Sequence, residues 1–187
     1  MKILMPIAGS NNQNESQYIK TLYEIGKKTV LQYVYESLNH ITDAEFIIVL
    51  RHEDICQYHL DDMVKLLIPD VKVIVAEGAT KGAACSCLLA IDEIKDDEPL
   101  LIVGSDQVLN INPQEVINHF VERDLDGGVI VFDDIHPRWS YVKLDENEMV
   151  VEAAEKRPIS RNATTGFYYF KLSKNICACN TMRARKH

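Results

Sequence analysis

The sequence of 187 residues lacks several features that would assign it to a class at once. No apolar run approaches the length of a membrane span, and the apolar stretch 3–7 is too short for the core of a signal peptide. The five cysteines, an odd number, match no zinc-ligand spacing, so we interpret them as reduced thiols. These features argue against a membrane protein, a disulfide framework and a zinc site, and they predict a cytoplasmic protein.

Positive charge is also scarce. Lys and Arg number 20 against 28 Asp and Glu, which gives a net charge of -8. A nucleic-acid-binding protein normally presents a basic face, so this balance argues against a nucleic-acid partner. A phosphate-bearing ligand would have to be held by local cations or a metal ion. Hydrophobic residues make up 47% of the chain and charged residues 26%, which is typical of a globular domain with a sizeable core.

Strand-like and helix-like segments alternate through the first two thirds of the chain, which is typical of a parallel α/β sheet. Strands are expected at residues 2–7, 46–50, 71–76 and 99–103, and helices at 29–39, 54–67, 83–94 and 113–122. Four further strands without long helices between them are expected at 129–132, 140–144, 150–154 and 166–170. We therefore predict an α/β fold: a three-layer, Rossmann-like mixed sheet that is mainly parallel in its N-terminal half and more antiparallel afterwards.

The expected strand at 99–103 runs into Gly104, Ser105 and Asp106. In an open α/β sheet, ligands bind in the crevice outside the carboxyl ends of the strands. An Asp at that position is well placed to hold a hard cation such as Mg²⁺ against a phosphate. Asp is equally common as the cap of a turn, and this segment alone leaves both interpretations open.

Two small-residue segments would meet Asp106 in the same crevice. Ala8, Gly9 and Ser10 follow the first strand and would let backbone N–H groups approach phosphate oxygens, although the chain has no GxGxxG and no Walker lysine. Residues 78–82 place two glycines around a lysine before a helix. That arrangement fits a phosphate or a planar base, and it fits an ordinary tight turn equally well.

Three further segments carry charged or aromatic residues. Glu155, Lys156 and an arginine precede a proline, a pattern that usually marks an exposed hairpin end. Trp139, the one tryptophan, lies between two expected strands, where it could pack or bind a sugar. Asp124 and Asp126 form a DxD, but they follow a helix and precede two glycines, so we interpret them as a solvated turn.

Five motifs, in order, resemble those of sugar-phosphate nucleotidyltransferases. Residues 20–30 are similar to the family signature P-K-P-L-[IL]-x-[IV]-x-G-K-P-[ML]. The other matches are residues 78–84 to the nucleotide-binding loop, 104–106 to the N-G-D metal motif, 155–158 to the E-K-P motif and 165–170 to the G-[IL]-Y-x-F strand. Order and spacing agree from about residue 1 to residue 171.

The resemblance implies a nucleotide-diphospho-sugar-transferase (GT-A-like) fold. It implies that a nucleoside triphosphate and a sugar 1-phosphate give a nucleotide sugar and pyrophosphate, for surface polysaccharide synthesis. Among the catalytic residues it implies, Lys20 would neutralise the triphosphate, Asp106 would hold Mg²⁺, and Lys156 would bind the sugar phosphate. The residues it places at the nucleotide are Ala8, Gly9, Ser10, Gly78, Lys81 and Gly82. Those it places at the sugar are Glu155, Thr165, Gly166 and Trp139.

The chain departs from the family pattern in the first loop and around Lys20. The loop reads Gly9-Ser10-Asn11-Asn12-Gln13 where the family usually has G-x-G-[ST]-R. The prolines on both sides of Lys20 are replaced, by Ile19 and Thr21. These departures favour one alternative, a catalytically impaired nucleotide-binding module. A GT-A glycosyltransferase is a second alternative, against which the placement of the DxD and the Lys20 segment count.

The resemblance also ends before the chain does. Family members continue to a further helix and a second metal-binding Asp, whereas this match stops near Lys171. We therefore expect a nucleotidyltransferase-like domain over residues 1–172 and a poorly ordered, non-family tail over 173–187, left by truncation or a frameshift. A homo-oligomer stays open as a further partner.

Overall fold

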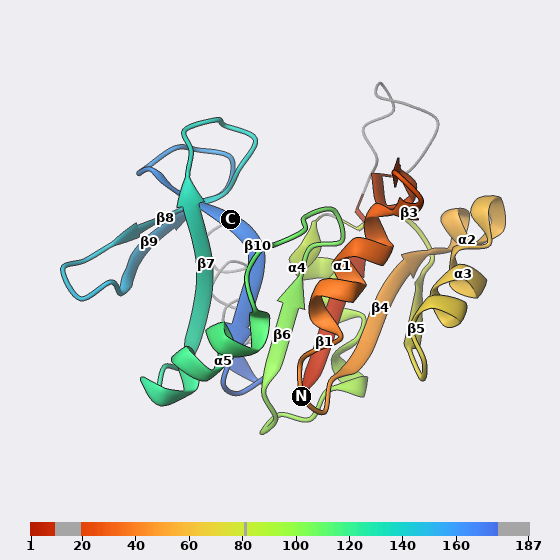
Figure 1. Ribbon diagram of the computed structural model, residues 1–187, viewed down its shortest axis with the longest axis horizontal. Coiled ribbons are helices and arrows are strands. Elements are labelled where there is room, and N and C mark those ends of the chain that lie inside the picture. Colours follow the sequence, from red (N-terminus) through yellow and green to blue (C-terminus); the bar gives the residue numbers. More distant parts are fainter. Residues whose placement is uncertain (10–19, 81, 176–187) are drawn as a thin grey trace.

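The computed structural model describes residues 1–9, 20–80 and 82–175, and its centre is one mixed sheet (Figure 1). The strand order is β5-β4-β1-β6-β10-β8-β9, with β7 also paired to β10. The parallel strands are β5 (Lys72–Ala76), β4 (Glu45–Arg51), β1 (Lys2–Ile7) and β6 (Leu100–Val103). The antiparallel strands are β10 (Asn162–Phe170), β7 (Gly127–Asp133), β8 (Tyr141–Leu144) and β9 (Val150–Ala154). The predicted fold class is confirmed.

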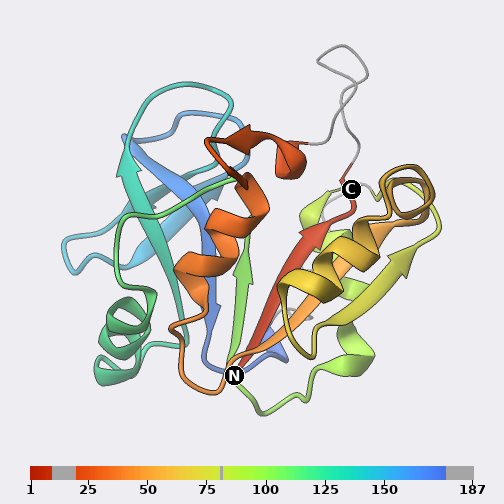
Figure 2. The same ribbon diagram turned by 45° about the vertical axis from the view of Figure 1, so that its right-hand side comes forward.

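Helices cover both faces of the sheet, as the turned view shows (Figure 2). One face carries α1 (Val30–Leu38), α3 (Leu60–Leu67) and α5 (Pro113–Glu122), and the other carries α4 (Ala83–Leu88). Ile3 and Met5 of β1 pack with Leu31 of α1, whereas Leu4 packs with Cys87 of α4. Successive side chains of a strand point to opposite faces, so β1 contributes to both cores and fixes the three layers.

The start of α1 follows from a capping box. The Thr29 hydroxyl accepts a hydrogen bond from the Gln32 amide at 3.2 Å, and the Gln32 side chain accepts one from the Thr29 amide at 2.7 Å. These bonds satisfy backbone donors that an uncapped helix would leave free. Just before this cap, β2 (Glu24–Ile25) and β3 (Lys28–Thr29) form a small hairpin that the sequence patterns do not predict.

Two predicted helices are shorter than expected. The helix predicted at 54–67 is divided into α2 (His52–Tyr58) and α3 because His59 adopts left-handed backbone, with φ 51°. The helix predicted at 83–94 ends at Leu88 and continues as a 3₁₀ turn, Ile91–Glu93. Ser and Cys, which make up half of α4, are poor helix formers, which accounts for its early end.

The first residues of the expected tail lie against the loop at residues 95–98. Ser173 is buried, its hydroxyl donates to the Lys95 carbonyl, and its amide donates to the Glu98 carbonyl at 3.0 Å. Residues 176–187 lie outside the described residues, so the domain boundary at residue 172 stays a prediction. In the part of the chain that the structure describes, no helix combines the length and apolar character that a membrane span needs.

Gly128 on β7 is where an added side chain would collide with the core. A Cβ at this position would lie 2.5 Å from two carbons of the Phe120 ring, and Phe120 is stacked on Tyr169 with ring centroids 5.7 Å apart. We expect Gly128→Ala to lower the free energy of unfolding by about 1–3 kcal/mol, measured by urea denaturation, because the ring must leave its packed position. Gly78→Ala is the control, since its Cβ would meet nothing within 4 Å. Equal losses in the two variants would contradict this packing.

Candidate functional site

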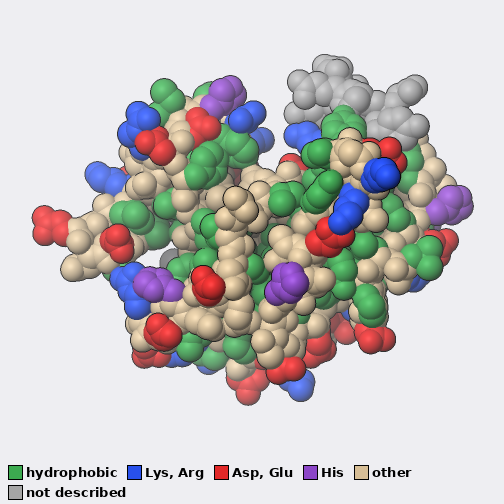
Figure 3. Space-filling model, viewed as in Figure 1, with side chains coloured by type: hydrophobic (Ala, Val, Ile, Leu, Met, Phe, Trp, Pro, Cys, Tyr) green, Lys and Arg blue, Asp and Glu red, His purple; other side chains and the backbone are tan. Residues whose placement is uncertain are grey.

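A cavity of about 360 Å³ lies at the carboxyl ends of β1 and β6. Of the predicted site residues, its lining contains Gly9, Lys20, Asp106 and Gly166. The space-filling view shows this edge of the molecule hollowed between the loops that follow β7 and the β2–β3 hairpin (Figure 3). The structure thus brings together residues from four separate segments of the chain, at the edge of the sheet where the sequence predicted a ligand.

Asp106 reaches the cavity because β6 ends at Val103 and the chain turns through small residues. The Gly104 amide donates to the Gly166 carbonyl at 3.0 Å, which joins the end of β6 to β10. A Cβ added at Gly104 would lie 3.6 Å from Asp106 Oδ1, so the carboxylate lies close over that glycine. Gly166 has φ +76°, a left-handed conformation that favours glycine. Gly104 and Gly166 both line the cavity and place no side chain in it.

Among the described residues that line the cavity, Lys20 is the one lysine, and no arginine is present. It begins a 3₁₀ turn, Lys20–Leu22, and it is exposed. Within the described residues no ion pair involves Lys20. Lys28 differs, because its Nζ lies 2.7 Å from a Glu36 carboxylate oxygen, and the hydrogen bond that Lys28 donates to Glu36 raises the pKa of Lys28. Within the described residues Lys20 therefore lies at the cavity without an ion-pair partner, whereas Lys28 is paired with Glu36.

The two loops predicted to hold the nucleotide lie side by side. Gly9 and Thr80 form an isolated parallel bridge, and the Thr80 amide donates to the Ala8 carbonyl at 3.1 Å. Gly82 follows with φ +138°, and α4 begins at the next residue, Ala83, which lines the cavity. Ser10 and Lys81 lie outside the described residues. Ala8, Gly78 and Gly82 do not belong to the lining, although Ala8 and Gly82 are next in the chain to Gly9 and Ala83, which do.

Most of the predicted sugar-binding residues do not line the cavity. The Thr165 side chain is buried, and its hydroxyl donates to the Ile130 carbonyl of β7 at 3.3 Å. Glu155 and Lys156 lie in the exposed turn after β9, where Lys156 has left-handed backbone with φ 51°. Gly166 is therefore the predicted sugar-side residue that the structure brings into the cavity wall.

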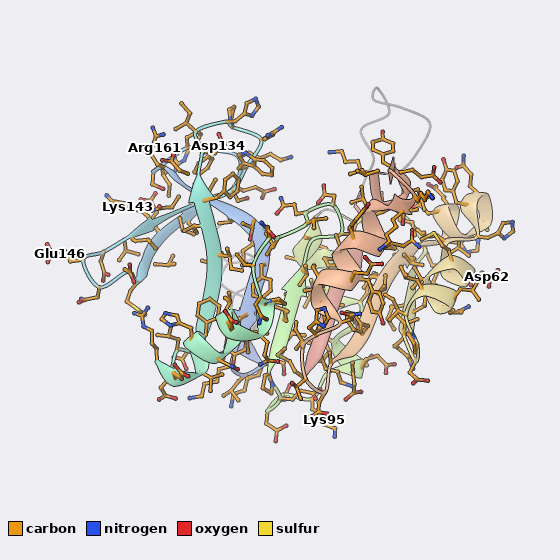
Figure 4. The ribbon with its side chains drawn as sticks, viewed as in Figure 1. Asp62, Lys95, Asp134, Lys143, Glu146 and Arg161 are labelled. Atoms are coloured by element: carbon orange, nitrogen blue, oxygen red, sulfur yellow. The ribbon has the colours of Figure 1, made fainter. Side chains whose placement is uncertain are left out.

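Trp139 is held by its neighbours in the loop after β7. Its indole Nε1 donates to an Asp134 carboxylate oxygen at 2.8 Å, and its ring meets Phe132 edge-on. The Arg138 guanidinium lies 4.4 Å from the ring centroid. The hydrogen bonds that the Asp134 carboxylate accepts from the His136 amide and from the Trp139 indole lower the pKa of Asp134. Asp134 and Arg161 lie together at this end of the molecule, whereas Lys143 and Glu146 lie on the outlying β8–β9 hairpin (Figure 4).

The described residues contain no group of three or more His, Cys, Asp or Glu side chains that could hold a metal ion by themselves. Mg²⁺ is commonly bound by one or two carboxylates together with substrate phosphates. One exposed carboxylate, Asp106, in the same cavity lining as a lysine fits an ion of that kind. Asp124 of the DxD lies elsewhere, paired with Lys171 at 2.6 Å, and that pairing lowers the pKa of Asp124. This geometry supports the interpretation of the DxD as a surface turn.

The sequence patterns missed Thr21, Tyr168 and Ser105 as cavity-lining residues. Thr21 is 3% exposed, and its Oγ1 is buried without a hydrogen-bond partner among the described residues. One signal was present, because Thr21 occupies a position where the resembling family has proline. A hydroxyl at that position cannot be placed in a cavity from the sequence alone.

The unpaired hydroxyl of Thr21 has a consequence for stability. We expect Thr21→Val to raise the free energy of unfolding by about 1 kcal/mol, because an isosteric methyl replaces a buried group that has lost its hydrogen bonds to water. The same change at Thr29, which caps α1, should lower it by about 1 kcal/mol. Urea denaturation of both variants measures the difference in sign. A loss of stability in Thr21→Val would show that its hydroxyl is satisfied.

The chain matches one protein family model and is similar to solved structures of known proteins. Residues 15–181 match the family model described as nucleotidyl transferase. No curated protein matches the chain. A nucleoside-diphosphate-sugar pyrophosphorylase from Vibrio cholerae RC9 superposes with a TM-score of 0.78 and 19% identity, over 97% of this chain and 78% of that one.

A second solved structure is a candidate glucose-1-phosphate thymidylyltransferase from Bacillus anthracis in complex with a sucrose. It superposes with a TM-score of 0.73 and 19% identity, over 96% of this chain and 74% of that one. At this identity the two structures show a shared fold, and the family match supplies the assignment. Since that match spans most of the chain, the protein belongs to the nucleotidyl transferase family, as the resemblance of its motifs implied.

Proposed function

We propose that this nucleotidyltransferase joins a nucleoside triphosphate to a sugar 1-phosphate and releases pyrophosphate. One observation carries the proposal: Lys20 and Asp106, far apart in the sequence, line the same cavity at the carboxyl edge of the parallel strands. Both substrates are anions, so the reaction is limited by repulsion and alignment more than by the need for a strong base. A lysine and a carboxylate suited to a metal ion address the repulsion directly.

The reaction is a displacement at phosphorus. A phosphate oxygen of the sugar 1-phosphate attacks the α-phosphorus, and the bond from that phosphorus to the bridging oxygen of the β-phosphate breaks. Pyrophosphate then carries away the electron pair. Lys20 would neutralise the triphosphate, and Asp106 would hold Mg²⁺, which supplies further positive charge to the phosphates. The segments at Gly9 and Gly82 would lie against the nucleotide.

The sugar 1-phosphate would occupy the β10 side of the cavity. Gly166 supports this placement because it lines the cavity from β10 and has no side chain to fill it. Lys156 and Glu155 precede β10 in the chain and would reach the sugar phosphate and hydroxyls from the turn after β9. Because the Thr165 hydroxyl and the Trp139 indole N–H already have partners, those residues would contribute backbone groups and a ring surface. A role in surface polysaccharide synthesis stays a prediction.

Product analysis tests this proposal. The purified chain is incubated with Mg²⁺, each nucleoside triphosphate in turn and a panel of sugar 1-phosphates, and pyrophosphate and nucleotide sugar are quantified. The expected result is equimolar release of both products for at least one pair. Triphosphate binding without pyrophosphate would favour an impaired binding module. Activity only with a ready-made nucleotide sugar and an acceptor would favour a glycosyltransferase, and either result would overturn the proposal.

A further inference from the structure

The Thr80 hydroxyl joins three parts of the chain beside the cavity. Its Oγ1 lies 3.1 Å from the Ala8 carbonyl oxygen, 3.3 Å from the Gly82 carbonyl oxygen and 2.6 Å from Ser86 Oγ. Ala8 follows β1, Gly82 precedes α4, and Ser86 lies within α4. A single hydroxyl therefore contacts the loop after β1, the loop after β5 and the helix that follows.

The two hydroxyls bond each other and share the neighbouring carbonyls. Each hydroxyl carries one proton and can accept from a second donor. If Ser86 donates across the short contact, Thr80 donates to the Ala8 carbonyl; if Thr80 donates, Ser86 donates to the Gly82 carbonyl at 3.5 Å. Ser86 is fully buried, so this bond also satisfies a hydroxyl that water does not reach. The Thr80 amide donates to the same Ala8 carbonyl at 3.1 Å, so side chain and backbone reinforce one another.

We infer that Thr80 and Ser86, here called the hydroxyl clamp, are positioning residues that fix the two nucleotide-binding loops against each other. Neither residue lines the cavity, whereas Gly9 on one side of the clamp and Ala83 on the other do. The clamp therefore acts through its neighbours and does not touch the substrate. This inference rests on the proposed function, because it assigns the nucleotide to the cavity side of these loops.

The two glycines of this loop make such a tie important. Residues 78–82 include two glycines, and Gly82 adopts φ +138°. Glycine loses more conformational freedom on ordering than any other residue, so an untied loop would lose entropy each time a nucleotide bound. Backbone N–H groups assist phosphate chemistry only when they are held in place beforehand. The clamp supplies that order before binding.

Three variants and a control separate positioning from general stability. Thr80→Val keeps the shape and removes the hydroxyl, and Thr80→Ser keeps the hydroxyl. Ser86→Ala removes the 2.6 Å contact with Thr80 together with the 3.5 Å contact to the Gly82 carbonyl. Ser173→Ala is the matched control, because that hydroxyl is also buried and bonds a distant carbonyl, that of Lys95, away from the cavity. Ser86→Ala keeps the test available if Thr80→Val fails to fold.

Kinetics and amide hydrogen exchange are then compared in all four variants. We expect Thr80→Val to raise KM for the triphosphate about tenfold, with kcat within about threefold of the parent, from the loss of one to two net hydrogen bonds. Thr80→Ser should restore KM to within about twofold. The amides of residues 80 and 86 should exchange faster in Thr80→Val and Ser86→Ala, and at the parent rate in Ser173→Ala.

Three results would contradict the hydroxyl clamp. The first is a fall in kcat at unchanged KM in Thr80→Val. The second is a Thr80→Ser variant as impaired as Thr80→Val, and the third is an unchanged amide exchange rate at residues 80 and 86. If the parent chain makes no nucleotide sugar, the proposed function fails by itself. The exchange rates of the same two amides would then still show whether the clamp orders the loop.

Discussion

Asp106→Asn is expected to lower the rate of pyrophosphate release by about a hundredfold or more at saturating substrates. The change preserves the size of the side chain and removes the negative charge that would hold Mg²⁺ against the triphosphate. Asp106 is exposed at the cavity, so its charge is not needed for packing. Initial rates of pyrophosphate release at a series of Mg²⁺ concentrations measure the effect, and a higher half-saturating Mg²⁺ concentration is expected in the variant.

Asp126→Asn is the matched control for this substitution. Asp126 is also an exposed aspartate in a turn, and it belongs to the DxD that follows α5. Its rate should stay within about twofold of the parent, since a surface charge far from the reacting phosphates is screened. A large loss in Asp126→Asn together with a normal rate in Asp106→Asn would move the metal to the DxD. That result would favour the glycosyltransferase alternative.

The largest expected effect on stability is at Arg51, the last residue of β4. Its Nε and Nη2 donate to the two carboxylate oxygens of Asp54 at 2.8 and 2.7 Å, and the side chains are 11% and 3% exposed. Arg51→Ala would leave the Asp54 carboxylate buried without its partner. We expect the free energy of unfolding to fall by about 3 kcal/mol, measured by urea denaturation near pH 7.

Two further variants test whether burial causes that loss. Lys65→Ala breaks an exposed i,i+4 pair with Asp61, which has an N–O distance of 2.8 Å, and should cost about 0.5 kcal/mol or less. A double variant, Arg51→Met with Asp54→Leu, should be more stable than Arg51→Ala, because no unpaired charge remains. If Arg51→Ala lowers the free energy of unfolding no more than Lys65→Ala does, burial adds nothing to the Arg51–Asp54 pair. That result would contradict the expectation.

The sequence was most informative where burial and chain direction determine the structure. A short apolar run that ends in Gly104 and Ser105 predicted a buried strand, and the parallel arrangement of such strands brings their carboxyl ends to one edge. The same pattern predicted Asp106 at that edge while leaving a turn cap equally open, and the structure places Asp106 in the cavity lining. Lys20 was placed by its motif, and the fold brings it into the same lining.

Features that depend on contacts between distant segments could not be predicted. The division of the 54–67 helix at His59 requires one left-handed residue that the apolar spacing does not reveal. The environment of Trp139 depends on Asp134 and Arg138 folding around its ring. The contact between Thr80 and Ala8 joins loops whose distance is fixed only once the sheet has formed. Local pattern carries no information about such neighbours.

The most direct test of nucleotidyl transfer is to identify which bond of the triphosphate breaks. The chain is supplied with Mg²⁺, a sugar 1-phosphate and a triphosphate labelled with ³²P at either the α- or the γ-phosphorus, and the labelled products are separated. If the bond between the α-phosphorus and the bridging oxygen of the β-phosphate breaks, the α label enters the nucleotide sugar and the γ label appears in pyrophosphate. This is the result that we predict. Release of the γ label as orthophosphate, or an α label that never joins the sugar, would contradict nucleotidyl transfer at this cavity.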